Sequence, residues 1–545
     1  MLQRRLPALL LPCLALAQGS SEACTDTFPG TGEGLSLETG VGSMPPSAED
    51  TKTASVGESL AIAIDSANPQ LEGAALLLAY ELVAPGAVPS PSLPGLAFDL
   101  AGNVSSASLG SLSSLAPASL QFSLPLGLAD AGLLLQAVAL PLDPSTTANG
   151  LFASSAGHRI DIAANAPLVL TEDVRITAND SVAGDNFGFD VALEGDLLAV
   201  GAPFDANISP DAGSAYTFDA NTGAQLQRFT GPIFLGDNFG SSVLLRDGRL
   251  LVGAPREDFV AQLSGRIYVF DALSGAGVAS LAPVGGGVSG PVGHSLGESM
   301  EISGDLLIAG TRGDTELVPG GGSAHLYDAS DGSLIGKLFP DDSAFADNFG
   351  FSVGVSGQRS VVGRPFDDVN GPDSGSALLF DTQTGNQLQL FAPTDASADD
   401  LVGTTVAIEG DTVLVGAPFL DLPGGSFNEG AVYVYDASSG ALRTRLISPQ
   451  PSANGRFGDG LATSPAYLLI GESLGTSSRG VASGLIHVYD RVSLQRLFQL
   501  ETSDGALGDA LGESIAIDGQ RVLAGARGAD FLGELSGAAY LFSLP

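Results

Sequence analysis

From residue 166 to its end, the chain alternates between short apolar runs and turns that contain glycine. The turn Glu194-Gly195-Asp196 is typical, because glycine supplies the positive φ that a tight hairpin requires. Tyr216 and Phe218 lie two positions apart, which places both rings on one face of a strand. The first copy of this pattern predicts four strands, at residues 189–193, 197–202, 214–219 and 225–229.

Seven copies of this unit follow one another at intervals of 52 to 57 residues. In each copy an aromatic or aliphatic residue precedes a glycine, and a second glycine follows 13 positions later. The first glycines are Gly188, Gly240, Gly297, Gly350, Gly403, Gly458 and Gly512, and the second are Gly201, Gly253, Gly310, Gly363, Gly416, Gly471 and Gly525. Seven four-stranded units at this period predict an all-β fold, a seven-bladed β-propeller in residues 166–545.

The repeated apolar and glycine positions are expected to serve the fold rather than a site. Phe187, Phe239, Phe349 and Phe457 should pack between neighbouring blades, and the second glycines should allow close approach of two backbones.

The ends of the repeat region predict how the ring closes. Only three residues follow Phe542, so the last copy lacks a fourth strand. Residues 171–176 occupy the register of that strand, because Ile176 precedes Gly188 by the same 12 positions that separate Phe391 from Gly403. We expect this amino-terminal strand to complete the seventh blade and to remove an exposed sheet edge.

The residues before the repeats fall into three parts. Residues 1–17 read as a secretory signal, with Arg4 and Arg5 before a short apolar run, so the protein is expected to be secreted or extracellular. Residues 18–48 are rich in Gly, Ser, Thr and Pro and suggest a flexible leader. Residues 49–165 suggest a small β domain resembling a sandwich, with a helix at 133–140 as the open alternative. The mature chain keeps only Cys24, too few cysteines for an internal disulfide.

The charge of the chain limits its partners. It has 61 acidic residues against 22 basic ones, a formal net charge of −39. Binding to nucleic acid depends on cationic neutralisation of phosphates, so that class of partner is excluded. Anionic membranes are disfavoured for the same reason, and no stretch after the signal is long and apolar enough for a transmembrane segment. Solubility in a salty medium is favoured over specific cation binding, and a monomer is expected.

The repeated segments resemble FG-GAP repeats, the blades of the integrin α-chain propeller and of many secreted bacterial proteins. Residues 186–193 read NFGFDVAL and are followed by AVGAP at 199–203, and the second copy reads NFGSSVLL and then LVGAP. The resemblance implies a seven-bladed propeller used for extracellular binding or scaffolding. In the integrin type a calcium loop lies between the two elements, whereas here a tight turn fills that space and an offset of 13 leaves no room for the loop. We therefore expect no metal and no cofactor, as in the calcium-free subtype of the repeat.

Loop length identifies the face on which a ligand would bind. The connections between strands 2 and 3, and between strand 4 and the next blade, are the long ones, and both kinds fall on one face. A solvated acidic rim is the favoured interpretation of their many acids. As a ligand-binding hypothesis, the candidate residues are Asp205, Asp211, Asp258, Asp314, Asp367, Asp368, Asp373 and Asp421.

No arrangement typical of an enzyme emerges from the sequence, so no catalytic residue is assigned. Arg312-Gly313-Asp314 is the tripeptide that integrins read, although chance explains it better in a chain rich in glycine and aspartate. The leading hypothesis is a secreted, non-enzymatic adhesion or scaffold protein that contacts a glycan, a matrix polymer or a protein. The alternative is an extracellular polysaccharide hydrolase or lyase that uses acids on the same face, and a structural surface-layer component is a third hypothesis. Clustered carboxylates with shifted pKa in a deep central pocket would favour the enzyme.

Overall fold

The structure, a computed structural model, describes strands between residues 35 and 163, and residues 168–545 apart from 208, 232–235, 259–262, 284–292, 479 and 481. Every regular element in this described part is a β-strand. None of these residues forms a helix of the length and apolar character that a membrane crossing requires. The chain divides into two compact units, Met1–Ala166 and Pro167–Pro545.

The first unit contains two sheets, one in the order β1-β3-β6 and one in the order β2-β9-β7-β4-β5, with β8 paired to β7. The segment for which a helix was the alternative is strand β7, and β1 lies within the expected leader. The expected signal at 1–17 and Cys24 lie outside the described residues. The strands are β1 (Leu35–Val41), β2 (Thr51–Ser55), β3 (Ser59–Ser66), β4 (Ala75–Val83), β5 (Ser105–Ser111), β6 (Ala118–Ser123), β7 (Gly132–Leu140), β8 (Ala153–Ser154) and β9 (His158–Ala163).

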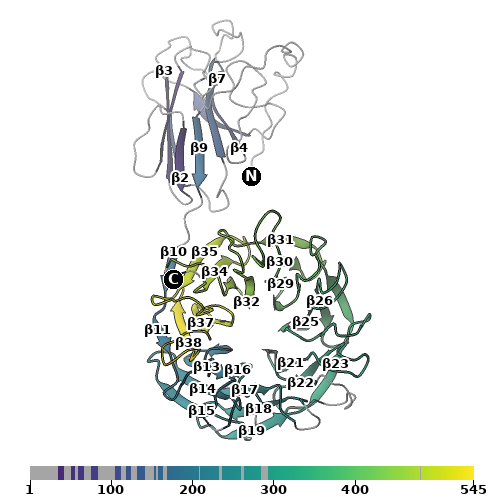
Figure 1. The fold of residues 1–545 in the computed structure, drawn as a ribbon. Coiled ribbons are helices and arrows are strands. Elements are labelled where there is room, and N and C mark those ends of the chain that lie inside the picture. The colour runs from purple at the N-terminus through teal and green to yellow at the C-terminus, as the bar shows by residue number, and fades with distance from the viewer. Residues whose placement is uncertain are drawn as a thin grey trace. The chain divides into compact units, whose positions relative to one another are not determined.

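The second unit is a ring of seven sheets around a central opening (Figure 1). Each sheet contains four antiparallel strands that form one blade, with the first strand nearest the centre, and the sheet of blade 6 has one further strand. This arrangement confirms the predicted fold. Blades 1 to 3 are β12 (Val191–Glu194), β13 (Leu197–Ala202), β14 (Ser214–Asp219) and β15 (Gln225–Phe229); β16 (Val243–Arg246), β17 (Arg249–Ala254), β18 (Arg266–Asp271) and β19 (Gly277–Leu281); β20 (Met300–Ser303), β21 (Leu306–Thr311), β22 (Ser323–Asp328) and β23 (Leu334–Leu338).

The remaining blades follow the same order. Blade 4 is β24 (Val353–Ser356), β25 (Arg359–Arg364), β26 (Ser376–Asp381) and β27 (Gln387–Phe391), and blade 5 is β28 (Thr405–Glu409), β29 (Thr412–Ala417), β30 (Ala431–Asp436) and β31 (Leu442–Leu446). Blade 6 is β32 (Phe457–Thr463), β33 (Tyr467–Glu472), β34 (Leu485–Asp490) and β35 (Arg496–Glu501), and blade 7 holds β36 (Ile515–Asp518), β37 (Arg521–Ala526) and β38 (Ala538–Ser543).

Two amino-terminal strands join the ends of the ring. Strand β11 (Val174–Ile176) pairs antiparallel with β38 and supplies the fourth strand of blade 7. Strand β10 (Leu168–Thr171) pairs parallel with β35 and adds a fifth strand to blade 6. The segment before the first repeat therefore pairs with two blades, whereas the sequence predicted a single strand that pairs with blade 7.

A contact between glycines fixes the distance between neighbouring blades. A Cβ built on Gly201 would lie 2.0 Å from the carbonyl oxygen of Gly240 in the next blade, closer than any real Cβ contact. The same contact closes the ring, since a Cβ on Gly525 of blade 7 would lie 1.9 Å from the Gly188 oxygen of blade 1. Gly188 has a φ of 88°, a conformation that side chains disfavour. Glycine is therefore required on both sides of the blade junction.

The phenylalanine before each first glycine fills the space that this spacing leaves. Phe187 is fully buried, and it packs against Tyr216 and Phe218 of blade 1 and against Leu523 and Leu541 of blade 7. Its ring meets those of Tyr216 and Phe218 edge to face at 5.6 and 5.7 Å. Phe239, Phe349 and Phe457 occupy the corresponding places, so the predicted role of these residues between blades is confirmed.

Hydrogen bonds between successive first strands build the wall of the central channel. The residue two positions after the first glycine links its blade to the next one in six of the seven junctions described. The Ser242 hydroxyl donates to Gly297 O at 2.7 Å, and Thr405 donates to Gly458 O at 2.6 Å. At the junction of blades 1 and 2 the same position is Asp190, which accepts from the Val243 amide at 2.8 Å. The remaining three links involve Ser514, Ser299 and Ser352.

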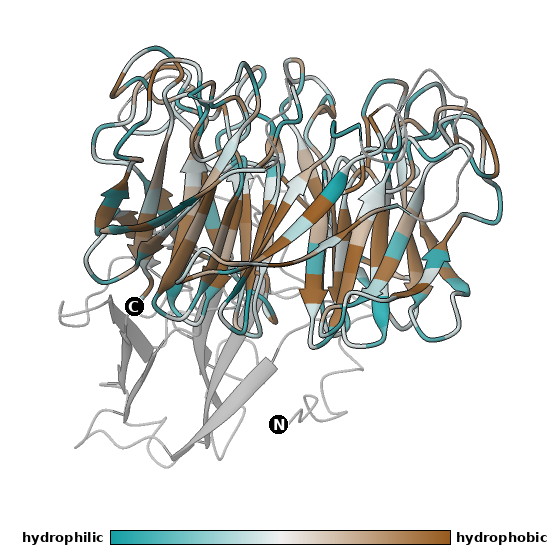
Figure 2. Cartoon of the chain, turned by 90° about the horizontal axis from the view of Figure 1, so that it is seen from below, coloured by the Kyte–Doolittle hydropathy of each residue, from teal (hydrophilic) through white to brown (hydrophobic). Residues whose placement is uncertain are grey.

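The two faces of the ring differ in the length of their loops (Figure 2). The tight turns between strands 1 and 2 and between strands 3 and 4 lie on one face, which we call the tight-turn face. The longer connections lie on the other, the long-loop face, because antiparallel strands alternate their ends. Each channel-lining strand begins at the long-loop face, so that face contains the mouth of the channel that the Gly188 series surrounds.

The glycine contact predicts that Gly201→Ala destabilises the propeller, because the new methyl group would overlap a backbone oxygen that cannot move without shifting a blade. We expect a loss of about 2 kcal/mol or more in the free energy of unfolding, measured by urea denaturation. Gly336→Ala in β23 is the control, since a Cβ there meets no atom within 4 Å. Equal stability of the two variants would contradict this account of the blade spacing.

Candidate functional site

Three of the sequence-predicted acids are buried anchors of their own loops. Asp205, Asp314 and Asp367 each lie four residues after the second glycine of their blade, and all three are buried. Asp205 accepts the Tyr216 hydroxyl at 2.9 Å and Arg228 Nη2 at 2.7 Å. Burial alone would raise the pKa of Asp205, but hydrogen bonds from Ser214 and Asn207 and the charge of Arg228 outweigh burial and lower it. All three carboxylates find hydrogen-bond partners within the protein.

The same arrangement recurs in blade 2, where the acid has the same position, and in blades 5, 6 and 7, where it comes from another position. In blade 2 the Tyr268 hydroxyl donates to Glu257 at 2.6 Å. In blade 5, Tyr433 donates to Asp395 at 3.0 Å. Blade 6 replaces the tyrosine by His487, whose Nε2 lies 2.9 Å from Glu472, and blade 7 pairs Tyr540 with Asp504 at 3.1 Å. A polar group on the third strand is thus satisfied by an acid of the long-loop face, which explains why that face is rich in acids.

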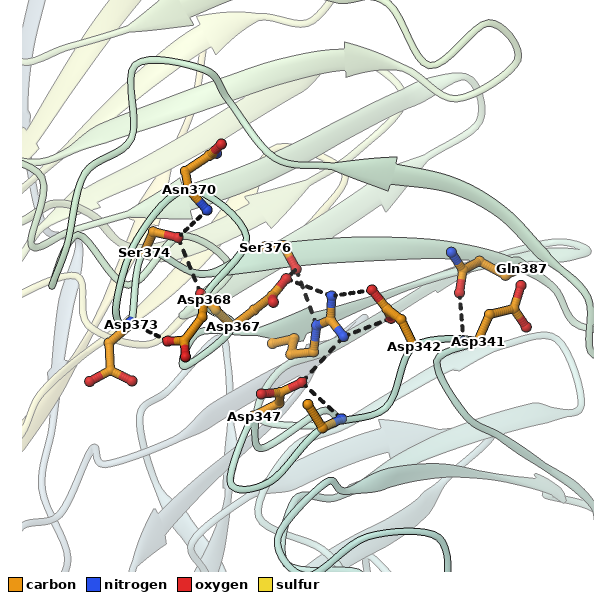
Figure 3. A network of polar contacts seen from close by, with 12 residues as sticks. Asp341, Asp342, Asp347, Asp367, Asp368, Asn370, Asp373, Ser374, Ser376 and Gln387 are labelled. Carbon is orange, nitrogen blue, oxygen red and sulfur yellow. Dashed lines mark hydrogen bonds and ion pairs between the residues drawn. The ribbon is translucent and has the colours of Figure 1, made fainter.

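In blade 4 a buried arginine, rather than a tyrosine, pairs with the acids of the long-loop face. Its third strand carries Leu378 at the tyrosine position, and Arg364 is only 1 % exposed. The guanidinium binds Asp367 at 2.5 Å, Asp342 at 2.9 Å and Asp347 at 3.3 Å, and the acids around it are drawn in Figure 3. Asp367 is therefore one of three counterions of a buried charge.

The other candidate acids support the loop backbone, and all are exposed except Asp373, which is half-buried. Asp258 and Asp368 lie five residues after the second glycine, and their carboxylates accept the amides of Leu263 and Asp373 at 2.7 and 2.9 Å. Asp421, at the same position in blade 5, accepts the Asn428 amide at 2.7 Å. Asp211 and Asp373 adopt positive φ at the end of their loops, where each carbonyl accepts an amide of the following connection. All eight residues make contacts that hold their own loops. Their role in binding a ligand stays a prediction.

The tripeptide Arg312-Gly313-Asp314 is not presented as an extended loop tip. Arg312 directly follows strand β21, and its Nε pairs with Glu298 at 2.6 Å. Asp314 is 1 % exposed and accepts the Ser323 hydroxyl at 2.7 Å. The carboxylate of this tripeptide is therefore not accessible to a partner that would bind it.

The central channel is a cavity of about 780 Å³ lined by the first strands of all seven blades. Its lining contains eight carboxylates and one arginine, Arg246. The acids are Asp190, Glu194, Glu298, Glu301, Glu409, Asp459, Glu513 and Asp518. The fold thus concentrates negative charge at its centre, where sequence reasoning placed none of its candidates.

Three of the channel acids have strongly shifted pKa values. Burial raises the pKa of Asp190 to about 6, although the Ser514 hydroxyl and the Val243 amide partly offset it. Burial also raises the pKa of Glu301 to about 7, and the nearby charge of Asp190 adds to the effect. Asp459 reaches about 6 through burial and the charge of Glu513. One signal of these residues was visible in the sequence, because Asp190 stands where five copies have Ser or Thr, and Glu301 where most have Ala or Gly.

Two blade junctions at the channel mouth carry the same trio of side chains. A glutamate next to the first glycine binds an arginine Nε, and the guanidinium lies over a phenylalanine of the following blade. The Nε–Oε2 distances are 2.6 and 2.5 Å, and the guanidinium carbons lie 5.2 and 5.5 Å from the ring centroids. The trios are Glu298, Arg312 and Phe351, and Glu513, Arg527 and Phe189. The arginines that replace the proline of GAP, Arg312 and Arg527, therefore each pair with a glutamate of the same blade.

Within the described residues, no group of three or more His, Cys, Asp or Glu side chains is arranged to hold a metal ion. In the loop where Asp205 and Asp211 alternate with polar residues, the Asp205 carboxylate binds Tyr216 and Arg228 rather than a metal ion.

The long-loop face also exposes apolar side chains. Among the described residues, ten large hydrophobic side chains of its loops are more than a third exposed, against two on the tight-turn face, Leu273 and Val492. Phe345 and Phe427 are the most prominent aromatic residues, at 75 % and 70 % exposure. The ten are Val182, Leu317, Phe345, Val369, Phe427, Ile447, Leu507, Phe531, Leu532 and Leu535.

Comparison with known families agrees with this architecture. The FG-GAP repeat family matches residues 170–218, 235–270, 333–380, 386–435 and 498–542, which fall on blades 1, 2, 4, 5 and 7. The chain is an FG-GAP repeat β-propeller protein. The two unmatched blades of this FG-GAP protein, 3 and 6, are those whose GAP element reads GTR and GES. No curated protein matches the sequence.

Several solved structures are distantly similar to this FG-GAP propeller. The quinohemoprotein alcohol dehydrogenase of Comamonas testosteroni is 13% identical with a TM-score of 0.39, covering 69% of this chain and 77% of its own. That of Pseudomonas putida HK5 is 12% identical with a TM-score of 0.37, covering 65% and 66%. Apo AztD of Citrobacter koseri is 11% identical with a TM-score of 0.36, covering 80% and 96%. Propellers host many functions, so nothing about the activity of this chain follows from these similarities.

Removal of the buried arginine tests the structural role of the candidate acids. Arg364→Ala leaves Asp347 and Asp367 without their counterion, and we expect a loss of about 3–5 kcal/mol in unfolding free energy. Arg359→Ala, on the same strand, breaks an exposed pair with Asp411 and should cost at most about 1 kcal/mol. Urea denaturation of both variants measures the difference, and a small effect for Arg364→Ala would refute the anchoring role.

The channel acids predict a dependence of stability on pH. The folded-state pKa values of Asp190 (about 6) and Glu301 (about 7) lie above the ordinary values of 3.8 and 4.5. The folded state therefore binds more protons than the unfolded state in the pH range between the ordinary and the raised pKa values. Their contribution is complete below about pH 4 and is lost as the pH rises to about 7. Asp190→Asn with Glu301→Gln should therefore reduce the fall in Tm between pH 5 and pH 7.5, as measured by calorimetry. Asp368→Asn is the control that should leave this fall unchanged, and an unchanged fall in the double variant would contradict the assignment.

Proposed function

We propose that this FG-GAP propeller is a secreted, non-enzymatic binding protein that engages a partner through its long-loop face. The observation that carries the proposal is the unequal distribution of exposed apolar side chains, which gather on that face. Soluble proteins rarely expose large apolar surfaces unless they contact another molecule. The rigid ring supports this role, because loops held by buried acids present a surface that loses little entropy on binding.

The chemistry of the face favours a protein over a polysaccharide as the partner. Its exposed large apolar side chains are mainly Leu, Val and Phe, which offer apolar area but no hydrogen bonds to sugar hydroxyls. The surrounding acids are committed to backbone amides or to arginines, as for Asp258 and Asp205. Secretion and adhesion remain part of the proposal through the signal expected at residues 1–17.

The central channel supports a second candidate function, that of a polysaccharide hydrolase or lyase. Asp190 and Glu301 line one cavity, and burial raises the pKa values of both toward neutrality, the range that suits the general acid of a glycosidase. The binding function has the stronger support, because Asp190 is held by Ser514 and Val243 as part of the channel wall. The enzyme would use the channel rather than the acids of the loops.

The binding proposal is tested with the full chain on an array of secreted proteins, matrix proteins and polysaccharides, with reaction products assayed alongside. A long-loop variant, Phe345→Ser with Phe427→Ser, Leu507→Ser and Leu532→Ser, is expected to weaken binding of the captured partner at least tenfold. The matched tight-turn variant, Leu273→Ser with Val492→Ser, should bind like the wild type, since it removes exposed apolar groups from the opposite face.

The outcomes separate the two functions. Saturable binding that is lost only in the long-loop variant supports the binding protein. Equal losses in both variants, or no binding to any protein, would refute it. Turnover of a polysaccharide that Asp190→Asn and Glu301→Gln abolish would establish the enzyme instead.

A further inference from the structure

Half of the exposed large apolar residues described on the long-loop face lie around a single blade. Val182, Leu507, Phe531, Leu532 and Leu535 have exposures of 46, 76, 38, 53 and 46 %. They lie on three loops at blade 7: the connection from blade 7 to blade 1, the connection from blade 6 to blade 7, and the loop between β37 and β38. We call these five residues the blade 7 patch.

Backbone contacts join the three loops into one surface. The Gly184 amide donates to Glu534 O at 3.0 Å, and the Asn186 amide donates to Leu535 O at 3.0 Å. On the other side, the Gly528 amide donates to Asp509 O at 3.1 Å. A Cβ on Gly528 would lie 1.9 Å from Gly508 O, so these two loops touch without a side chain between them. The patch is therefore built on loops whose relative positions are fixed.

Negative charge surrounds the patch. Residues 177–190, 502–514 and 527–537 contain eight carboxylates and one basic residue, Arg527, which is paired with Glu513. Glu534 and Asp530 are exposed beside the apolar side chains, and the Asp530 carboxylate accepts only the Leu535 amide among the hydrogen bonds described. Arg175 of β11 is paired with Asp504 at 2.8 Å. A cationic partner would be attracted to this rim, and an anionic one repelled.

The single aromatic ring of the patch argues against a sugar ligand. The Arg175 guanidinium lies 3.9 Å from the Phe531 ring centroid, so one face of the ring is already covered. The other four members are aliphatic, and aliphatic side chains provide contact area for apolar groups of a protein.

We propose that the blade 7 patch is the docking site for a protein segment that presents apolar side chains flanked by lysine or arginine. This inference rests on the proposed binding function and assigns that function to one blade and one class of partner. The apolar groups would cover Leu507, Leu532 and Leu535, and the basic groups would meet Asp530 and Glu534.

The test uses the full chain and three labelled peptides of equal length: a leucine–lysine amphipathic peptide, its leucine–glutamate counterpart and a serine–lysine peptide. Fluorescence anisotropy should show binding of the leucine–lysine peptide at least tenfold tighter than of either other peptide. Leu507→Ser with Leu532→Ser and Leu535→Ser should weaken that binding about tenfold. Phe345→Ser with Phe427→Ser, on the same face at other blades, is the matched control and should not change it. Circular dichroism melting verifies that both variants are folded.

A second variant tests the charge of the rim. Asp530→Asn with Glu534→Gln should reduce both the affinity for the leucine–lysine peptide and its dependence on salt, while asparagine keeps an oxygen for the Leu535 amide. Equal binding of the three peptides, or loss of binding in Phe345→Ser with Phe427→Ser alone, would overturn the inference. In the latter case the long-loop face would still bind and the proposed function would stand. Failure of every peptide, together with no partner on the protein array, would overturn both.

Discussion

The close contact between glycine backbones at each blade junction is the constraint on which the rest of this propeller depends. The second glycine of one blade lies against the carbonyl of the first glycine in the next, and the seventh junction, Gly525 to Gly188, repeats the first. This contact sets the blade spacing and therefore the size of the space that Phe187 and its equivalents fill. It also sets the diameter of the central channel, since the first strands follow directly from these glycines.

The charge of the protein is distributed in three different ways around that frame. Acids such as Asp205 and Asp367 are buried, where they accept hydrogen bonds from tyrosine hydroxyls or neutralise arginines. Acids such as Asp258 and Asp368 stay in solvent and support the turns of their loops. A third group, with Asp190 and Glu301, lines the channel, where partial burial raises its pKa values. A net charge of −39 is thus partly a consequence of architecture and not only a device for solubility.

Much of the fold could be predicted, because the repeat places the same residue types in the same role seven times. The blade count, the strand order and the place of Phe187 follow from periodicity and alternation. The parallel addition of β10 to blade 6 could not be foreseen, since Leu168–Thr171 contains no signal that distinguishes a fifth strand from a linker. Among the candidate site residues, the sequence showed which acids lie in long loops but not which of them would be buried. Burial of Asp314, for example, depends on Ser323 and Lys337, 9 and 23 residues away.

By itself, the sequence determined the architecture of this protein, because local patterns of glycine, apolar residues and turns are repeated often enough to allow one closed ring. Only the tertiary structure decided where its chemistry lies. Asp190 and Glu301 are more than a hundred residues apart and meet in the channel because ring closure brings the first strands of all blades to one axis. Val182 and Leu532 meet at blade 7 because the chain ends are joined there by β11. Residues so distant in sequence carry no local pattern that would show them to be neighbours.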